Sequence, residues 1–221
     1  MARMIGTAHL VLLLTIALLT SEAACQTTAP PPPPNPDASA GDNWSLAATA
    51  YGYLVPNDRS YFSPVFTADR RWLHLEARYN YENFQTGSLW AGYNFSIGHK
   101  LEFDFTPMLG GVFGDTSGIA PGYEMSLTYG PFELSSEGEQ LFTIKSRAND
   151  FFYSWNELVY SPKDWLHAGL VSQTTRAYQS PLDIQRGVFV GFSRKKMDFT
   201  TYVFNFGWTD PTVVMGLSCK F

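Results

Sequence analysis

The chain has 221 residues, with 15 Lys and Arg against 20 Asp and Glu, for a formal net charge of −5. This acidic balance lacks the basic patch that nucleic-acid binding requires, and two cysteines cannot build a disulfide framework. The longest apolar run, residues 10–20, is shorter than the roughly 20 residues of a membrane-spanning helix.

Residues 1–25 have the pattern of a secretory signal peptide. Arg3 supplies the positive start, residues 10–20 supply the apolar centre, and small residues follow. The pattern predicts export and removal of this segment. Cys25 also follows two alanines, as in a lipoprotein site, but Glu22 stands where such sites usually have Leu, so ordinary signal cleavage is the favoured interpretation.

Residues 26–43 form a proline-rich tract without apolar periodicity. Such a composition favours an extended polyproline II spacer. The remaining residues, 44–221, have the length of one domain.

Apolar and polar residues alternate with a period of two from Trp44 onward, which predicts an all-β domain. Pro64 and Pro107 fall inside predicted strands, where we expect β-bulges. Twelve strands are expected: 44–55, 60–70, 72–82, 88–98, 100–113, 119–130, 131–143, 150–161, 165–178, 184–194, 196–208 and 211–221.

The connections between these segments alternate in length. Those after even-numbered segments are tight, as at Gly130 and Pro131, whereas those after odd-numbered segments are longer, such as 113–122 and 178–184. The third segment shows the two faces best, with Leu73, Leu75, Ala77, Tyr79 and Tyr81 on one side and His74, Glu76, Arg78, Asn80 and Glu82 on the other.

The last segment ends the chain on an aromatic residue. Its apolar face carries Phe221, Cys219, Leu217, Met215 and Val213, and Gly216 lies five positions before Phe221. This strand resembles the closing strand of bacterial outer-membrane β-barrels, the small porin-like proteins among them. In that family the barrel-assembly machinery reads the last strand, so Gly216 and Phe221 are the expected assembly signal.

The resemblance implies a transmembrane, antiparallel, up-and-down β-barrel in the lipid of the outer membrane. About twelve strands are expected, or ten if the weakly apolar segment 131–143 does not span. The tight turns and both termini would be periplasmic, and aromatic girdles would lie near the strand ends. Residues expected in the girdles are Trp72, Tyr129, Tyr160, Trp165, Phe221, Tyr178 and Trp208.

On this register the interior receives a strong excess of carboxylates. Such an excess predicts a water-filled lumen, or loop arginines (Arg147, Arg176, Arg186) that fold inward. The residues expected to line the lumen are Asp69, His74, Glu76, Arg78, Glu102, Asp104, Glu124, Glu137, Glu139 and Glu157.

A twelve-stranded barrel is intermediate in width, so the favoured function is a narrow diffusion channel. Its acidic lumen would admit small cations or neutral polar solutes. The alternative is a closed structural or anchoring barrel, held by an internal salt-bridge network.

A lipid hydrolase is the least favoured function. The mature chain has His74, His99 and His167, all expected near the tight turns, and neither a His-x-Ser pair nor a G-x-S-x-G motif. No catalytic residue and no cofactor is predicted. Glu102, Asp104 and Glu124 would suit a divalent cation, but solvated acids are the default, so no metal site is predicted.

Overall fold

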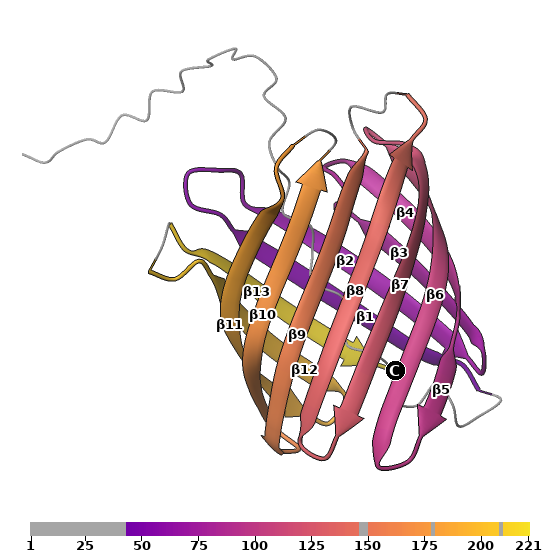
Figure 1. The fold of residues 1–221 in the computed structure, drawn as a ribbon, viewed down its shortest axis with the longest axis vertical. Coiled ribbons are helices and arrows are strands. Elements are labelled where there is room, and N and C mark those ends of the chain that lie inside the picture. The colour runs from indigo at the N-terminus through magenta and orange to yellow at the C-terminus, as the bar shows by residue number, and fades with distance from the viewer. Residues whose placement is uncertain (1–42, 146–149, 178–179, 208–209) are drawn as a thin grey trace, which may run out of the picture.

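The computed structural model describes residues 43–145, 150–177, 180–207 and 210–221. The predicted signal peptide and almost all of the spacer lie outside these residues. All regular elements in the described ranges are strands (Figure 1), and no helix there has the length and apolarity to cross a membrane. The strands are β1 Ser45–Leu54, β2 Tyr61–Arg70, β3 Leu73–Tyr79, β4 Thr86–Tyr93, β5 Phe95–Gly98, β6 Leu101–Gly114, β7 Gly118–Tyr129, β8 Phe132–Thr143, β9 Phe151–Lys163, β10 Leu166–Ala177, β11 Asp183–Arg194, β12 Met197–Phe204 and β13 Thr212–Lys220.

The strands form one closed antiparallel barrel. Strands that follow one another in sequence pair, except β4 and β5, and β1 pairs with β13 from Ala47 opposite Lys220 to Leu54 opposite Val213. β4 and β5 lie end to end along β6 and occupy a single position in the wall. The barrel therefore has the twelve strand positions that the sequence predicts, and the alternative count of ten is wrong.

Neither of the two prolines inside strands needs a bulge, so that expectation is wrong. Gly92 opposite Met108 and Phe95 opposite Phe105 keep one register, although the ladder is interrupted at Asn94. The interruption falls at Pro107 of β6, because proline has no N–H to donate to the ladder. Pro64 keeps the β1 register, and it lies just beyond the point where β3 begins to pair with β2.

The two ends of the barrel differ in their connections. At one end, the turn end, every connection has two residues: 71–72, 99–100, 130–131, 164–165 and 195–196. Arg71 (φ 53°) and Lys195 (φ 57°) adopt the left-handed backbone that such short hairpins require. The opposite, loop end carries longer connections, although 115–117 is shorter than predicted because β6 and β7 extend further. β1 begins and β13 ends at the turn end, in the lower part of Figure 1.

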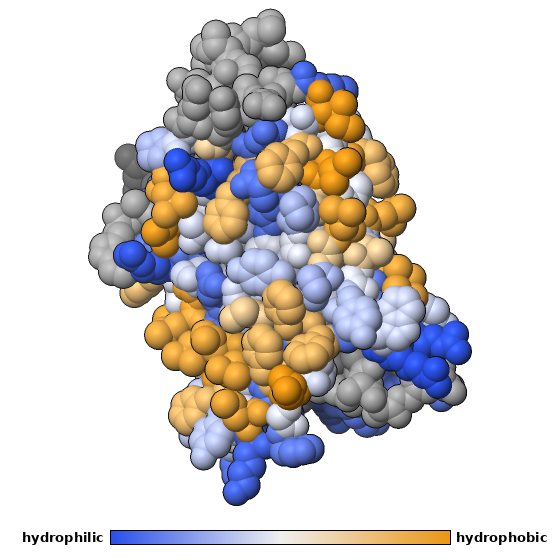
Figure 2. Space-filling model, turned by 45° about the vertical axis from the view of Figure 1, so that its right-hand side comes forward, coloured by the Kyte–Doolittle hydropathy of each residue, from blue (hydrophilic) through white to orange (hydrophobic). Residues whose placement is uncertain are grey.

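The outward face is apolar, as the period-two pattern predicts. On β13, Met215 and Leu217 are exposed, whereas the alternate residues Val214, Gly216 and Ser218 are buried. Figure 2 shows broad patches of apolar side chains on one side of the barrel, with paler side chains between them. The expected girdle residues at the turn end are all exposed: Trp72, Tyr129, Tyr160, Trp165 and Phe221. Tyr178 and Trp208 lie outside the described residues.

A charge placed on the middle of this face tests whether it contacts lipid. Leu170 of β10 is 59% exposed and lies near the middle of its strand. We expect Leu170→Arg to lower the free energy of unfolding in lipid vesicles by about 2–4 kcal/mol, because a midplane Arg loses its hydration. Leu101→Arg, at the first position of β6, is the matched control and should cost roughly 1 kcal/mol or less. Equal costs at the two depths would contradict a lipid-facing surface.

Candidate functional site in the barrel lumen

Alternation along the strands places the polar side chains of the barrel in its interior. Glu124 of β7, Glu157 of β9 and Asp104 of β6 are half-buried, and Glu102 is exposed at the turn end. The remaining residues expected in the lumen are almost fully buried: Asp69, His74, Glu76, Arg78, Glu137 and Glu139.

Arg78 links two walls of the barrel. From β3 it reaches Glu76 on its own strand, with Nε 2.8 Å from Oε1. Its Nη1 lies 3.0 Å from Glu139 Oε2 and 3.3 Å from Glu137 Oε1 on β8. Because β3 and β8 are not neighbours in the wall, these ion pairs cross the lumen and narrow it. We call Glu76, Arg78, Tyr81, Glu137 and Glu139 the Arg78 network.

Two aromatic rings enclose the Arg78 guanidinium. Its central carbon lies 4.3 Å from the Tyr81 ring centroid and 4.5 Å from that of Trp90, both within cation–π range. The Tyr81 hydroxyl donates a hydrogen bond to Glu137. Tyr81 lies in the 80–85 connection, where burial raises its pKa above the usual range and keeps the hydroxyl protonated.

The inward position of Tyr81 corrects the sequence prediction, which placed it on the outward face. β3 ends at Tyr79, and Asn80 takes a positive φ of 55°. This backbone conformation breaks the alternation, so both Tyr81 and Glu82 turn inward and become buried. Glu82 then accepts a hydrogen bond from Ser88, whose oxygen in turn accepts one from Trp90 Nε1 at 2.9 Å.

An aromatic cluster fills another part of the interior. Trp155 of β9 is fully buried and meets Tyr202 and Phe204 of β12 edge to face, at centroid distances of 5.3 and 5.1 Å. Its Nε1 donates to Glu157 Oε1 at 2.7 Å. Trp155 lies two residues from Glu157, which was predicted to line the lumen, so strand alternation puts both side chains on the same face. The pattern of a single strand could not show which rings meet Trp155.

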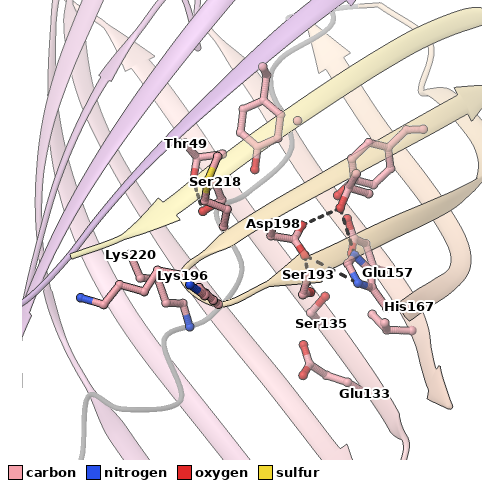
Figure 3. Close-up of a pocket in the computed structure, with 17 residues that line it drawn as sticks. Thr49, Glu133, Ser135, Glu157, His167, Ser193, Lys196, Asp198, Ser218 and Lys220 are labelled. Atoms are coloured by element: carbon pink, nitrogen blue, oxygen red, sulfur yellow. Dashed lines mark hydrogen bonds and ion pairs between the residues drawn. The ribbon is translucent and has the colours of Figure 1, made fainter. Parts of the chain in front are cut away.

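A polar cavity of about 330 Å³ lies beside this cluster (Figure 3). Asp198 accepts hydrogen bonds from Ser193 (2.6 Å) and Thr200 (2.8 Å). His167 Nε2 lies 3.0 Å from the Thr200 hydroxyl, and its Nδ1 lies 3.7 Å from Asp198. In Figure 3, Lys196 and Lys220 lie across the cavity from this group. The lining also includes Tyr51, Tyr202, Glu157, Thr49 and Ser218.

Sequence reasoning missed Asp198 as a lumen residue. The inward face of the segment 196–208 starts with Lys196, Asp198 and Thr200 and continues with Tyr202 and Phe204. The alternation from Lys196 to Thr200 was the signal that could have placed Asp198 in the lumen. The pairing of Ser193 with Asp198 across β11 and β12 is what brings the cavity residues together.

The interior keeps its acidic excess in the described part of the chain. Arg176 and Arg186 are exposed, and strand alternation points both outward, so the expectation that they fold inward is wrong. Arg147 lies outside the described residues. Among the described Lys and Arg residues, Arg78 is the one that is buried.

The positions of the three histidines do not match those that a lipid hydrolase needs. His74 is buried and pairs with Asp69, and His167 faces the lumen cavity. A catalytic residue for lipid hydrolysis would have to reach the lipid surface instead. His99 lies in the exposed turn 99–100.

Gly216 and Phe221 have local structural roles at the seam between β1 and β13. The Tyr51 ring lies over Gly216, so that an added Cβ would come within 3.0 Å of it. The Phe221 N–H donates to the Leu46 carbonyl at 2.9 Å, and its side chain is exposed. These contacts explain a small residue at 216 without reference to an assembly signal.

No protein-family model matches the sequence, and no curated protein matches it. Solved structures do resemble the fold. The KdgM porin is 9% identical and aligns over 79% of this chain and 99% of its own, with a TM-score of 0.55. The KdgM porin in complex with disordered oligogalacturonate is 10% identical over 80% of this chain and 99% of its own, with a TM-score of 0.56. The chain therefore has the fold of a porin-like outer-membrane β-barrel.

Proposed function

We propose that the protein is an outer-membrane channel that passes small cations or neutral polar solutes by diffusion. The observation that carries this proposal is the polar cavity beside Asp198 and His167, inside a closed barrel with an apolar exterior. Its volume lies in the range of small-molecule pockets. Hydroxyl, carboxylate, lysine, histidine and tyrosine side chains surround the space, and such groups bind polar solutes by hydrogen bonds.

The acidic excess of the interior argues for cations over anions. Carboxylate rings attract cations and repel anions in narrow pores. The acidic excess lies in the Arg78 network, with three glutamates to one arginine. The cavity itself is balanced, since Glu133, Glu157 and Asp198 line it beside Lys195, Lys196 and Lys220.

The proposed orientation puts the turn end and both termini in the periplasm. Short turns face the periplasm in barrels of this kind, and longer loops face outward. Outer-membrane lipid would surround the apolar face, and the barrel-assembly machinery would insert the chain by its last strand. We also propose that residues 1–25 are removed as a signal peptide and that residues 26–43 serve as a periplasmic spacer.

Recording in planar bilayers tests the channel. We expect folded protein to give discrete conductance steps, with a reversal potential in a KCl gradient that indicates cation preference. Asp198→Asn with Glu157→Gln should reduce that preference severalfold, because two carboxylates of the cavity lose their charge. Asp58→Asn, an exposed residue of the 55–60 connection, is the control. Folded protein without conductance would contradict the proposal.

The alternative is a closed barrel that serves structure or anchoring. The ion pairs from β3 to β8 favour it, since they connect two separate parts of the wall through buried charges. The same recordings decide between the two. A silent barrel that resists SDS until it is heated would identify the closed form.

A further inference from the structure

We propose that His74, Glu76 and Glu124 form a binding site for a divalent transition-metal ion such as Zn²⁺. One ligand atom from each of the three residues lies within 4.8 Å of the others, which makes them the one such group of His, Cys, Asp and Glu among the described residues. The site joins β3 to β7 inside the lumen. It does not depend on whether the barrel conducts.

His74 is oriented as a metal ligand. Its Nδ1 lies 2.8 Å from Asp69 Oδ1, and Asp69 is held in turn by Asn94 Nδ2 at 2.8 Å. When a carboxylate accepts a hydrogen bond from Nδ1–H, the lone pair of Nε2 is left to bind a metal. Such a carboxylate is the usual outer-shell partner of a histidine ligand. His74 is 4% exposed, and its Nε2 has no hydrogen-bond partner. This atom faces Glu76, 3.6 Å from Oε2.

Glu124 supplies the second independent observation. Its Oε1 is buried and has no hydrogen-bond partner. Glu124 lies directly opposite Glu137 in the pairing of β7 with β8, and like charges in that position destabilise a sheet. A cation between the walls removes this repulsion.

The charge balance around the site favours a divalent ion. Around this site, acidic side chains outnumber basic ones. Among the described residues, the basic ones at the site are Arg78 and His74. The acidic set consists of Asp69, Glu76, Glu82, Glu124, Glu137 and Glu139. Two added positive charges reduce this acidic excess.

The donor set selects the class of metal. One imidazole nitrogen and two carboxylates suit Zn²⁺ and its first-row neighbours, whereas Ca²⁺ and Mg²⁺ take oxygen ligands. Zn–N and Zn–O bonds of about 2.0–2.2 Å need the donors roughly 3–4 Å apart, a small contraction by side-chain rotation. Arg78 also contacts both oxygens of Glu76, but each oxygen has a second lone pair for a ligand bond.

Metal binding to the folded, EDTA-treated barrel in detergent tests the proposal. Zn²⁺ titration by calorimetry should give one site per chain, and Co²⁺ should give a visible absorption band that Zn²⁺ removes. We expect His74→Gln and Glu124→Gln each to weaken Zn²⁺ binding at least tenfold. His99→Gln, at the exposed turn, is the matched control and should bind like the unchanged chain.

Folding is checked in the same samples by the shift in SDS mobility on heating, so that a misfolded variant is not scored. Glu124→Gln keeps the size and hydrogen-bonding capacity of the side chain. It therefore still tests the site if His74→Gln fails to fold. The proposal fails if the folded chain binds no Zn²⁺, as it would if the carboxylates take up protons instead. It also fails if both variants bind Zn²⁺ as tightly as the unchanged chain.

Discussion

Replacing Arg78 with Met should lower the free energy of unfolding by about 3–5 kcal/mol, the usual cost of removing one partner from a buried ion pair. The change leaves Glu76, Glu137 and Glu139 buried without their cation, and it removes the ring contacts with Tyr81 and Trp90. Urea unfolding in lipid vesicles, followed by tryptophan fluorescence, measures the loss.

A compensating variant separates charge from packing. Arg78→Met combined with Gln at positions 76, 137 and 139 removes the unpaired charges, and we expect it to recover most of the stability. Arg194→Met, at the exposed end of β11, should change stability by no more than about 0.5 kcal/mol. If Arg78→Met alone is equally harmless, the glutamates are solvated, and the interior network does not hold the walls together.

Replacing Trp155 with Ala should both destabilise the barrel and widen it. Deleting a fully buried aromatic side chain costs about 3–5 kcal/mol. Trp155 contacts Tyr202 and Phe204 and donates to Glu157, so its removal opens space beside the lumen cavity. If the protein conducts, single-channel conductance should rise together with the loss of stability.

Trp165→Ala is the matched control, because Trp165 is 55% exposed on the outward face near the turn end. It removes the same side chain from the opposite side of the wall. We expect a smaller loss of stability and unchanged conductance. Two tryptophan variants with the same conductance would show that the aromatic cluster does not limit flow.

The strands were predictable because the apolar exterior and the polar lumen of the barrel impose opposite demands on alternate residues. In β3 the alternation of Leu73, Leu75 and Ala77 with His74 and Glu76 specifies both the strand and its sidedness. β13 does the same, with apolar residues outward and Gly216 and Ser218 inward. In both segments the pattern predicts the strand and its outward face without information about the neighbouring strands.

The contacts inside the barrel were not predictable, because they join residues far apart in the sequence. The link from Arg78 to Glu139 spans 61 positions, and it depends on how the wall curves. Tyr81 was misplaced because one residue, Asn80, leaves the extended backbone and shifts the alternation. The histidine and carboxylates at 74, 76 and 124 meet only because β4 and β6 separate their strands by a fixed distance.

Closure between β1 and β13 gives this fold a cyclic order, in which no strand is first or last. The Phe221 amide already bonds to Leu46, so the first and last strands meet at one seam. A circularly permuted chain, joined across that seam and opened at a connection of the loop end, retains every strand pairing. Such a chain no longer ends on Phe221, and it thereby separates the folding of the barrel from the proposed recognition of its carboxyl terminus.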